Sequence, residues 1–245
     1  MKTFIFVSTL LISNLCFANE LTTRNSWPNF LCTTYPKDYI CITIPKKSKT
    51  KTIKWNELFS DELFTEVLKK VNRRNTNIRP KDVIAIPLEL YLDTDLLDPT
   101  LLTLMTTYIE TEHTKVVIVD PQLLQYSAYQ DGSLIKWGIV NIGSKICSDT
   151  KLNKCKTPVG NFYIITKKGK FSRSNLYPTD CKDKKKCGAK LYYSMIFHNS
   201  GASLHGHDTL PGYNASHGCI RLLREDAAWL YQFINKETKI VIKDY

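Results

Sequence analysis

The sequence has 245 residues, 43% of them hydrophobic, and a formal net charge of +11. This composition excludes a chain without a packed core, and the length fits one large domain or a medium domain with a small companion. The basic residues are clustered but lack the aromatic and glycine pattern of RNA-binding modules, so nucleic acid is not the expected partner. The clusters include PKKSKTKTIK, KKVNRR, KKGK and CKDKKKC.

The N-terminus predicts a signal peptide. A basic start precedes an apolar run at residues 4–17, which is short for a membrane-spanning helix and ends in small residues. We expect residues 1–18 to be removed on export to the periplasm or cell envelope. An uncleaved anchor and a lipoprotein acylated at Cys16 are the alternatives, and the bulky Leu15 disfavours the second. No second long apolar run follows, so we expect no stable membrane insertion after cleavage.

Residues 19–112 predict a small α+β domain that ends in a connector. FLCTTY and YICITIP flank a PKD turn, and we expect a β-hairpin over residues 29–45 whose arms are bridged by Cys32 and Cys41. WNELFSDELFTEVLKKVNRRN has apolar residues close to helical spacing and predicts a helix, after which DVIAIPLEL returns to a strand. Residues 89–112 then form a connector of mixed local structure.

One stretch of this region resembles a known module. VNRRNTNIRPKDVIAIP, from Val71 to Pro87, is similar to the second half of a LysM peptidoglycan-binding module, in which a helix ends at an asparagine and a short strand closes with isoleucine and proline. Lys81 stands where such modules favour glycine, and the first half matches poorly. The resemblance implies glycan binding, and a purely supporting α+β domain is the alternative.

Residues 113–245 predict a mainly β domain. Short runs rich in Val, Ile, Tyr and Phe alternate with turns and cysteine-bearing loops, namely KVVIVD, LLQYSAY, SLIKWGIVNIG, NFYIITKKG and LYYSMIFHN. Such spacing is typical of a β-sandwich or a barrel-like fold. REDAAWLYQFINK predicts one helix with acidic residues in its first turn, and KIVIKDY predicts a closing strand.

The cysteine count leaves one thiol over. Loss of Cys16 with the signal peptide leaves seven of the eight cysteines, which is an odd number. Export favours disulfides, and six cysteines form three sequence-local couples, although about fifteen pairings are open. These six are Cys32, Cys41, Cys147, Cys155, Cys181 and Cys187. We therefore expect Cys219 to be a reactive thiol or an intermolecular bridge.

The stretch SLHGHDTLPGYNASHGCIRL supplies groups for a cysteine nucleophile. A thiol attacks a carbonyl as the thiolate and needs a neighbouring base, for which His205 and His217 are the candidates. His217 precedes Cys219 by two residues, and alternate residues of an extended strand point the same way. His205 would come across from the preceding strand, with better geometry for a hydrogen bond. The peptide N–H groups of Gly218 and Cys219 are candidates for an oxyanion site, and Arg221 for a carboxylate clamp.

Other interpretations use the same residues. A zinc site is feasible from the spacing of His205, His207, His217 and Cys219, but no Cys-x-x-Cys or His-Glu-x-x-His motif accompanies them. A buried structural thiol is another alternative. A phosphatase loop would need an arginine farther from the cysteine than Arg221 is. We therefore expect no metal and no cofactor.

The motifs together resemble one enzyme family. HG at residues 205–206 followed by SHGCIRL at residues 216–222 is similar to the signature of the L,D-transpeptidase catalytic domain family of the YkuD type. TPVGNF at residues 157–162 matches the family's T-P-x-G-x-F pattern, and REDAAWLY resembles the helix after its nucleophile. The resemblance runs from about Lys115 to the C-terminus. It implies a β-rich domain with a Cys-His site at the end of a sheet, acting on peptidoglycan.

The resemblance also assigns residues and chemistry. Carried over position by position, it implies that Cys219 is the nucleophile and His205 the principal proton carrier. It also implies that four further residues line the site, namely Ser216, His217, Gly218 and Arg221. It implies acyl transfer from a tetrapeptide stem, with loss of D-alanine, to an amine of a neighbouring stem or of a wall-linked protein. Water as acceptor would give an L,D-carboxypeptidase, and a non-catalytic peptidoglycan-binding protein is a further alternative. His207 and the cysteine-bearing insertions depart from the family pattern and leave substrate choice open, while the lysine clusters suit an anionic envelope.

Overall fold

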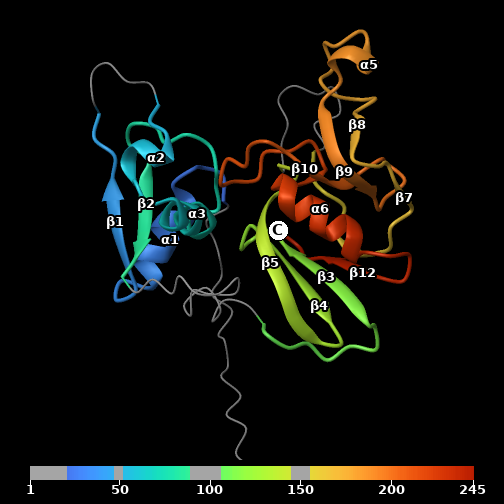
Figure 1. Cartoon of the computed structure of the whole chain (residues 1–245), viewed down its shortest axis with the longest axis horizontal. Helices are drawn as coiled ribbons and strands as arrows, with labels where there is room; N and C mark the ends of the chain where they lie inside the picture. Colours follow the sequence, from blue (N-terminus) through green and yellow to red (C-terminus); the bar gives the residue numbers. More distant parts are fainter. Residues whose placement is uncertain (1–20, 47–51, 89–105, 145–154) are drawn as a thin grey trace, which may run out of the picture.

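The computed structural model describes residues 21–46, 52–88, 106–144 and 155–245 (Figure 1). The expected signal peptide, most of the expected connector and Cys147 lie outside these ranges. Within these ranges, none of the helices combines the length and the apolar character needed to span a bilayer.

The N-terminal part is a small α+β unit, as predicted. Its elements in chain order are α1 (Ser26–Thr34), β1 (Tyr39–Thr43), α2 (Trp55–Leu58), α3 (Glu62–Val71) and β2 (Val83–Pro87). The two strands pair antiparallel, with Tyr39 opposite Pro87 and Thr43 opposite Val83. The helices lie beside this two-stranded sheet (Figure 1).

The hairpin predicted over residues 29–45 is wrong. Ser26–Thr34 is a helix because Trp27 and Leu31, one helical turn apart, are both fully buried, and tertiary packing overrides the β propensity of FLCTTY. The indole N–H of Trp27 donates to the Val71 carbonyl at 2.7 Å and fixes this packing. The disulfide between Cys32 and Cys41 is present, but it joins a helix to a strand.

The single helix predicted from WNELFSDELFTEVLKKVNRRN is two helices, α2 and α3. Asp61 separates them because its side chain accepts a hydrogen bond from the Phe64 N–H at 2.7 Å and caps α3. Thr65, Leu68 and Val71 form the buried face of α3, so the predicted apolar spacing holds within this second helix.

The rest of the described chain is mainly β, as predicted. Its strands are β3 (Lys115–Asp120), β4 (Gln125–Gln130), β5 (Ser133–Asn141), β6 (Gly160–Phe162), β7 (Thr166–Lys167), β8 (Phe171–Arg173), β9 (Lys190–Ile196), β10 (Ser203–Gly206), β11 (Ile220–Leu222) and β12 (Lys239–Ile242). Its helices are α5 (Lys184–Cys187) and α6 (Arg224–Phe233). The strand order is β6-β12-β3-β4-β5-β11-β10-β9-β7, with β8 paired to β9. Neighbours are antiparallel except for two parallel pairs, β10 with β11 and β12 with β3.

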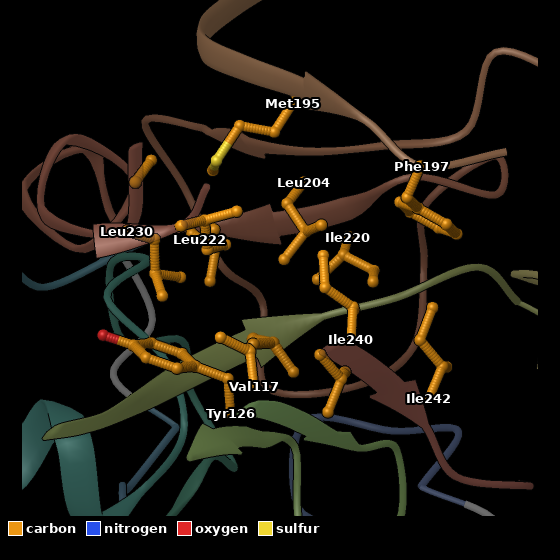
Figure 2. Packing of buried hydrophobic residues seen from close by; sticks show 14 of the residues in the cluster. Val117, Tyr126, Met195, Phe197, Leu204, Ile220, Leu222, Leu230, Ile240 and Ile242 are labelled. Carbon is orange, nitrogen blue, oxygen red and sulfur yellow. The ribbon is translucent and has the colours of Figure 1, made fainter. Parts of the chain in front are cut away.

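The sheet curves so that its two halves pack on each other. Figure 2 shows Val117 and Tyr126 of one half facing Leu204, Ile220 and Leu222 of the other across the core. Helix α6 packs against β9 and β10 and adds apolar side chains to the same core. Strand residues alternate between the two faces of a sheet. The neighbours of Leu204 on β10, and the residue between Ile220 and Leu222 on β11, therefore lie on the opposite face.

A second apolar cluster joins the two parts of the chain, and we call it the junction cluster. It draws on the N-terminal part and on the β domain, and includes Trp27, Leu31, Val71, Trp137, Ile139 and Leu210. The guanidinium of the fully buried Arg73 lies 4.8 Å from the Trp27 ring and 5.0 Å from the Trp137 ring. It also donates to the Leu123 carbonyl at 2.9 Å and to Gln125 Oε1 at 2.8 Å.

Candidate active site

Cys219 lies in a tight turn immediately before β11. Gly218 has a φ of +105°, a left-handed conformation that favours glycine, so the chain bends at residues 217–219. The buried Ser216 hydroxyl donates to the Cys219 carbonyl and accepts from the Gly218 N–H at 3.3 Å. The expected alternation of His217 and Cys219 along an extended strand is therefore wrong. The two hydrogen bonds of Ser216 stabilise the turn instead.

His205 reaches the same face from β10. It is paired with Arg221 across the parallel strands, one register step beyond the pair Leu204 and Ile220. Two residues earlier on β10, the Ser203 hydroxyl lies 3.6 Å from the Cys219 sulfur. Strand alternation thus puts Ser203, His205 and Arg221 on the face away from the apolar core, and the contact with Ser203 brings the Cys219 sulfur to the same face.

The imidazole of His205 is held as a neutral base. Burial lowers the pKa of His205 to about 4, the charges of Arg221 and His207 act in the same direction, and the hydrogen bond to Gly206 opposes them. His205 Nδ1 lies 3.0 Å from the Gly206 carbonyl oxygen. Because a carbonyl only accepts, Nδ1 carries the proton in this neutral ring, and Nε2 is the nitrogen that can take a proton from a thiol.

His217 is stacked on an aromatic ring. Its ring centroid is 4.5 Å from that of Tyr177, with the planes 28° apart. Tyr177 belongs to the insertion between β8 and β9, which the disulfide between Cys181 and Cys187 closes. The cysteine-bearing insertion that departs from the family pattern therefore reaches the candidate site.

Two further cationic or titratable groups flank His205. Burial lowers the pKa of Arg221, and the electrostatic interaction with Cys219 opposes that effect. The ring centroid of His207 is 6.3 Å from that of His205, and its Nδ1 accepts from the Thr209 N–H at 3.1 Å. No group of three or more His, Cys, Asp or Glu side chains within the described ranges is placed to hold a metal ion. The arrangement offers a thiol, a base and a guanidinium, which suit nucleophilic acyl chemistry.

The remaining cysteines are engaged elsewhere. Cys32 is bonded to Cys41, Cys181 is bonded to Cys187, and Cys155 is also in a disulfide. Among the cysteines that the structure describes, Cys219 alone is free. It is therefore the thiol available for chemistry in this part of the chain.

A sequence model of the L,D-transpeptidase catalytic domain (YkuD) matches residues 114–242, which is more than half of the chain. The chain belongs to this family. It is 34% identical over 89 residues to the Bacillus subtilis (strain 168) protein YciB, named for L,D-transpeptidase activity. That alignment covers 35% of this chain and 46% of YciB, so the chain spans about half the length of this curated relative.

Two solved structures that carry the name L,D-transpeptidase match part of this chain at low sequence identity. One from Xylanimonas cellulosilytica DSM 15894 has 21% identity and a TM-score of 0.48, covering 59% of this chain and 67% of that one. Another, from Stackebrandtia nassauensis, has 24% identity and a TM-score of 0.42, covering 56% and 58%.

The TPVGNF motif of this L,D-transpeptidase domain stabilises the turn at residues 217–219 through Gly143 and Ser216. The Thr157 hydroxyl accepts from the Gly143 N–H at 2.9 Å, and Gly143 in turn bridges to Ser216. A side chain at Gly143 would collide with the Cys155 carbonyl oxygen, so only glycine allows this approach. The motif thereby connects through Gly143 and Ser216 to the backbone of Cys219.

Sequence reasoning missed two residues of the candidate site. Ser203 precedes His205 by two positions, and strand alternation, applied to SLH, is the signal that places both on one face. Tyr177 lies in an irregular segment some forty positions before His217, and no local pattern points to their contact.

Proposed function

We propose that the protein is an exported peptidoglycan L,D-transpeptidase in which Cys219 is the nucleophile and His205 the proton carrier. The observation that carries the proposal is the neutral, buried imidazole of His205 on the same sheet face as the free thiol of Cys219. Membership of the L,D-transpeptidase family supports the reaction class.

In the first step the thiolate forms and attacks. Nε2 of His205 takes the thiol proton, and Cys219 sulfur bonds to the carbonyl carbon between the L-centre and the D-residue of a tetrapeptide stem. The N–H groups of Gly218 and Cys219 stabilise the oxyanion. His205 then returns the proton to the departing amine, the C–N bond breaks, D-alanine leaves, and a thioester remains.

In the second step an acceptor resolves the thioester. An amine of a neighbouring stem attacks the thioester carbon, His205 takes the amine proton, and the sulfur leaves with a proton, which forms a cross-link. An amine of a wall-linked protein would react in the same way. With water as the attacking group the product is a tripeptide and the enzyme is an L,D-carboxypeptidase, because the same residues serve each acceptor.

Arg221 and His217 are proposed to bind the stem. The desolvated guanidinium of Arg221 suits a carboxylate of the peptide, because charge-assisted hydrogen bonds are strongest away from water. His217 and Tyr177 offer an aromatic surface beside the nucleophile. Ser216 acts through the turn that it holds rather than on the substrate.

The wider organisation follows the same proposal. Residues 1–18 direct export, residues 19–112 support the site and contact glycan strands, and residues 113–245 are the catalytic domain. A groove of about 550 Å³ beside α2 and α3 is a candidate for the glycan contact, since amide and aromatic side chains line it, among them Asn56, Phe59 and Asn77. The lysine-rich surface suits an anionic envelope.

Incubation with disaccharide-tetrapeptides, followed by mass analysis of the products, tests the reaction. Dimers lacking one D-alanine establish transpeptidation, whereas tripeptides establish the carboxypeptidase. Cys219→Ala should give neither product while it keeps the melting temperature of the wild type. Turnover that survives Cys219→Ala would remove the proposed nucleophile, and binding to sacculi by an inactive wild type would favour the non-catalytic alternative.

A further inference from the structure

The segment that connects the two candidate catalytic residues rests on the N-terminal part of the chain. Residues 207–214, which we call the linking loop, follow His205 and lead to the turn that carries Cys219. We infer that Asn75, which follows α3, is a positioning residue that sets the placement of His205 relative to Cys219 through this loop. The inference rests on the proposed function, in which these two side chains exchange a proton.

Asn75 makes three hydrogen bonds to the backbone of the linking loop. Its side-chain Nδ2 donates to the Asp208 carbonyl at 3.1 Å, and its Oδ1 accepts from the Leu210 N–H at 2.7 Å. Its own backbone N–H donates to the Leu210 carbonyl at 3.1 Å. Both ends of the amide therefore point at the loop, as expected for a residue that fixes its path.

Other contacts also pack the linking loop against the N-terminal part of the chain. Arg74 forms a β-bridge with Pro211, and a Cβ placed on Gly212 would lie only 3.2 Å from the Arg74 Cβ. Leu210 is fully buried in the junction cluster. The N-terminal part thus forms one wall against which the loop is packed.

The two ends of the loop are tied to the catalytic sheet. The His207 N–H donates to the Leu222 carbonyl at 2.8 Å, and the Ser216 N–H, beyond the other end, donates to the Ile142 carbonyl at 2.9 Å. The ends of the loop are anchored beside His205 and Cys219. A shift of the middle of the loop would therefore change the positions of both residues. A displacement of about 1 Å in such a frame is enough to cost roughly 10²-fold in rate.

The loop has room to move if Asn75 releases it. A cavity of about 340 Å³ adjoins it, lined by α3, the start of α6 and the loop itself, with Lys69, Asn75, His207 and Arg224 among its residues. Without the Asn75 amide, the Asp208 carbonyl and the Leu210 N–H would lose their hydrogen bonds. The loop would shift toward the cavity so that water could replace them, because unpaired backbone groups are costly. Asn75 therefore fixes the loop where packing alone leaves space.

Asn75→Ala in the full chain tests the inference, with two readouts. Steady-state turnover of disaccharide-tetrapeptide should show kcat lower by about 10-fold to 10²-fold, with KM changed little, because the chemistry and not the binding is disturbed. Alkylation of Cys219 by iodoacetamide at pH 7 needs the thiolate but no wall substrate, and it should slow as well. Asn75→Asp keeps the acceptor for the Leu210 N–H, so both rates should lie between those of the wild type and Asn75→Ala.

Asn25→Ala is the matched control. The Asn25 Nδ2 donates to the Lys81 carbonyl at 3.0 Å and its Oδ1 accepts from the Val83 N–H at 2.9 Å, and both partners lie in the N-terminal part, outside the linking loop. This variant should lower the melting temperature and leave kcat and alkylation unchanged at temperatures where the protein is folded. Equal kcat and alkylation rates in Asn75→Ala and wild type would overturn the inference, as would a loss in Asn25→Ala as large as in Asn75→Ala. If the wild type gives no muropeptide product but Asn75→Ala slows alkylation, the proposed reaction fails while the positioning role stands.

Discussion

Acid should destabilise the folded protein through His205. Burial, reinforced by Arg221 and His207, lowers the pKa of His205 from 6.5 to about 4, and the side chain is only 3% exposed. The unfolded chain therefore binds a proton between these pH values that the folded chain does not. The stabilising effect is complete above pH 6.5 and is lost progressively as the pH falls to about 4. At about 1.4 kcal/mol for each pH unit, the loss is about 3 kcal/mol.

Urea denaturation at a series of pH values, in parallel for wild type and His205→Gln, isolates this effect. The other titrating groups, including His207 with its own lowered pKa, are present in both proteins and cancel in the difference. Between pH 7 and pH 4 the wild type should lose about 3 kcal/mol more than the variant. The Cε1–H signal of His205 in NMR spectra should titrate in the same acidic range.

Parallel stability curves for the two proteins would refute the reasoning. So would a His205 signal that titrates above pH 7, because at neutral pH the resting site would then hold mostly imidazolium rather than neutral imidazole. In that case His205 could not take the thiol proton, and the first proposed step would begin from an ion pair.

Three other variants have defined outcomes. Tyr177→Ala removes the ring stacked on His217 and should raise KM for disaccharide-tetrapeptide roughly 3- to 10-fold, from about 0.5–1.5 kcal/mol for such a pair, and an unchanged KM would place the stack outside the substrate path. The double change Cys32→Ser and Cys41→Ser should lower the free energy of unfolding by about 2–3 kcal/mol in urea titration, and equal stability would contradict the stapling role of that disulfide. Leu210→Ala empties part of the junction cluster and should cost about 2–5 kcal/mol by the same measurement, whereas a loss under about 1 kcal/mol would show that the cluster closes over the cavity.

Strand patterns in the β domain were informative because both faces of each strand have defined environments. KVVIVD, SLIKWGIVNIG and KIVIKDY all contain strands, and REDAAWLYQFINK contains α6 with its acidic first turn. The sequence also predicted that His205 comes toward Cys219 from the preceding strand, and His205 lies in β10. These features depend on residues close together in sequence, where periodicity is a direct signal.

Contacts between distant segments could not be predicted in the same way. FLCTTY has the composition of a strand, but its helix exists because Trp27 packs against Val71, and nothing in the segment records that partner. The stack of Tyr177 on His217 depends on how an insertion folds over the sheet. The hydrogen bonds of Asn75 join positions more than a hundred residues apart, so only the assembled fold brings them together.

The buried guanidinium of Arg73 bears on whether the two parts of the chain can move relative to each other. It lies between Trp27 and Trp137, which belong to different parts of the chain, and donates to Gln125 Oε1 and to the Leu123 carbonyl. A hinge opening between the two parts would break these two hydrogen bonds and separate the guanidinium from Trp137, which makes the motion costly. We therefore expect the two parts to move as one body, so the support of the linking loop stays in place whether or not a substrate is bound.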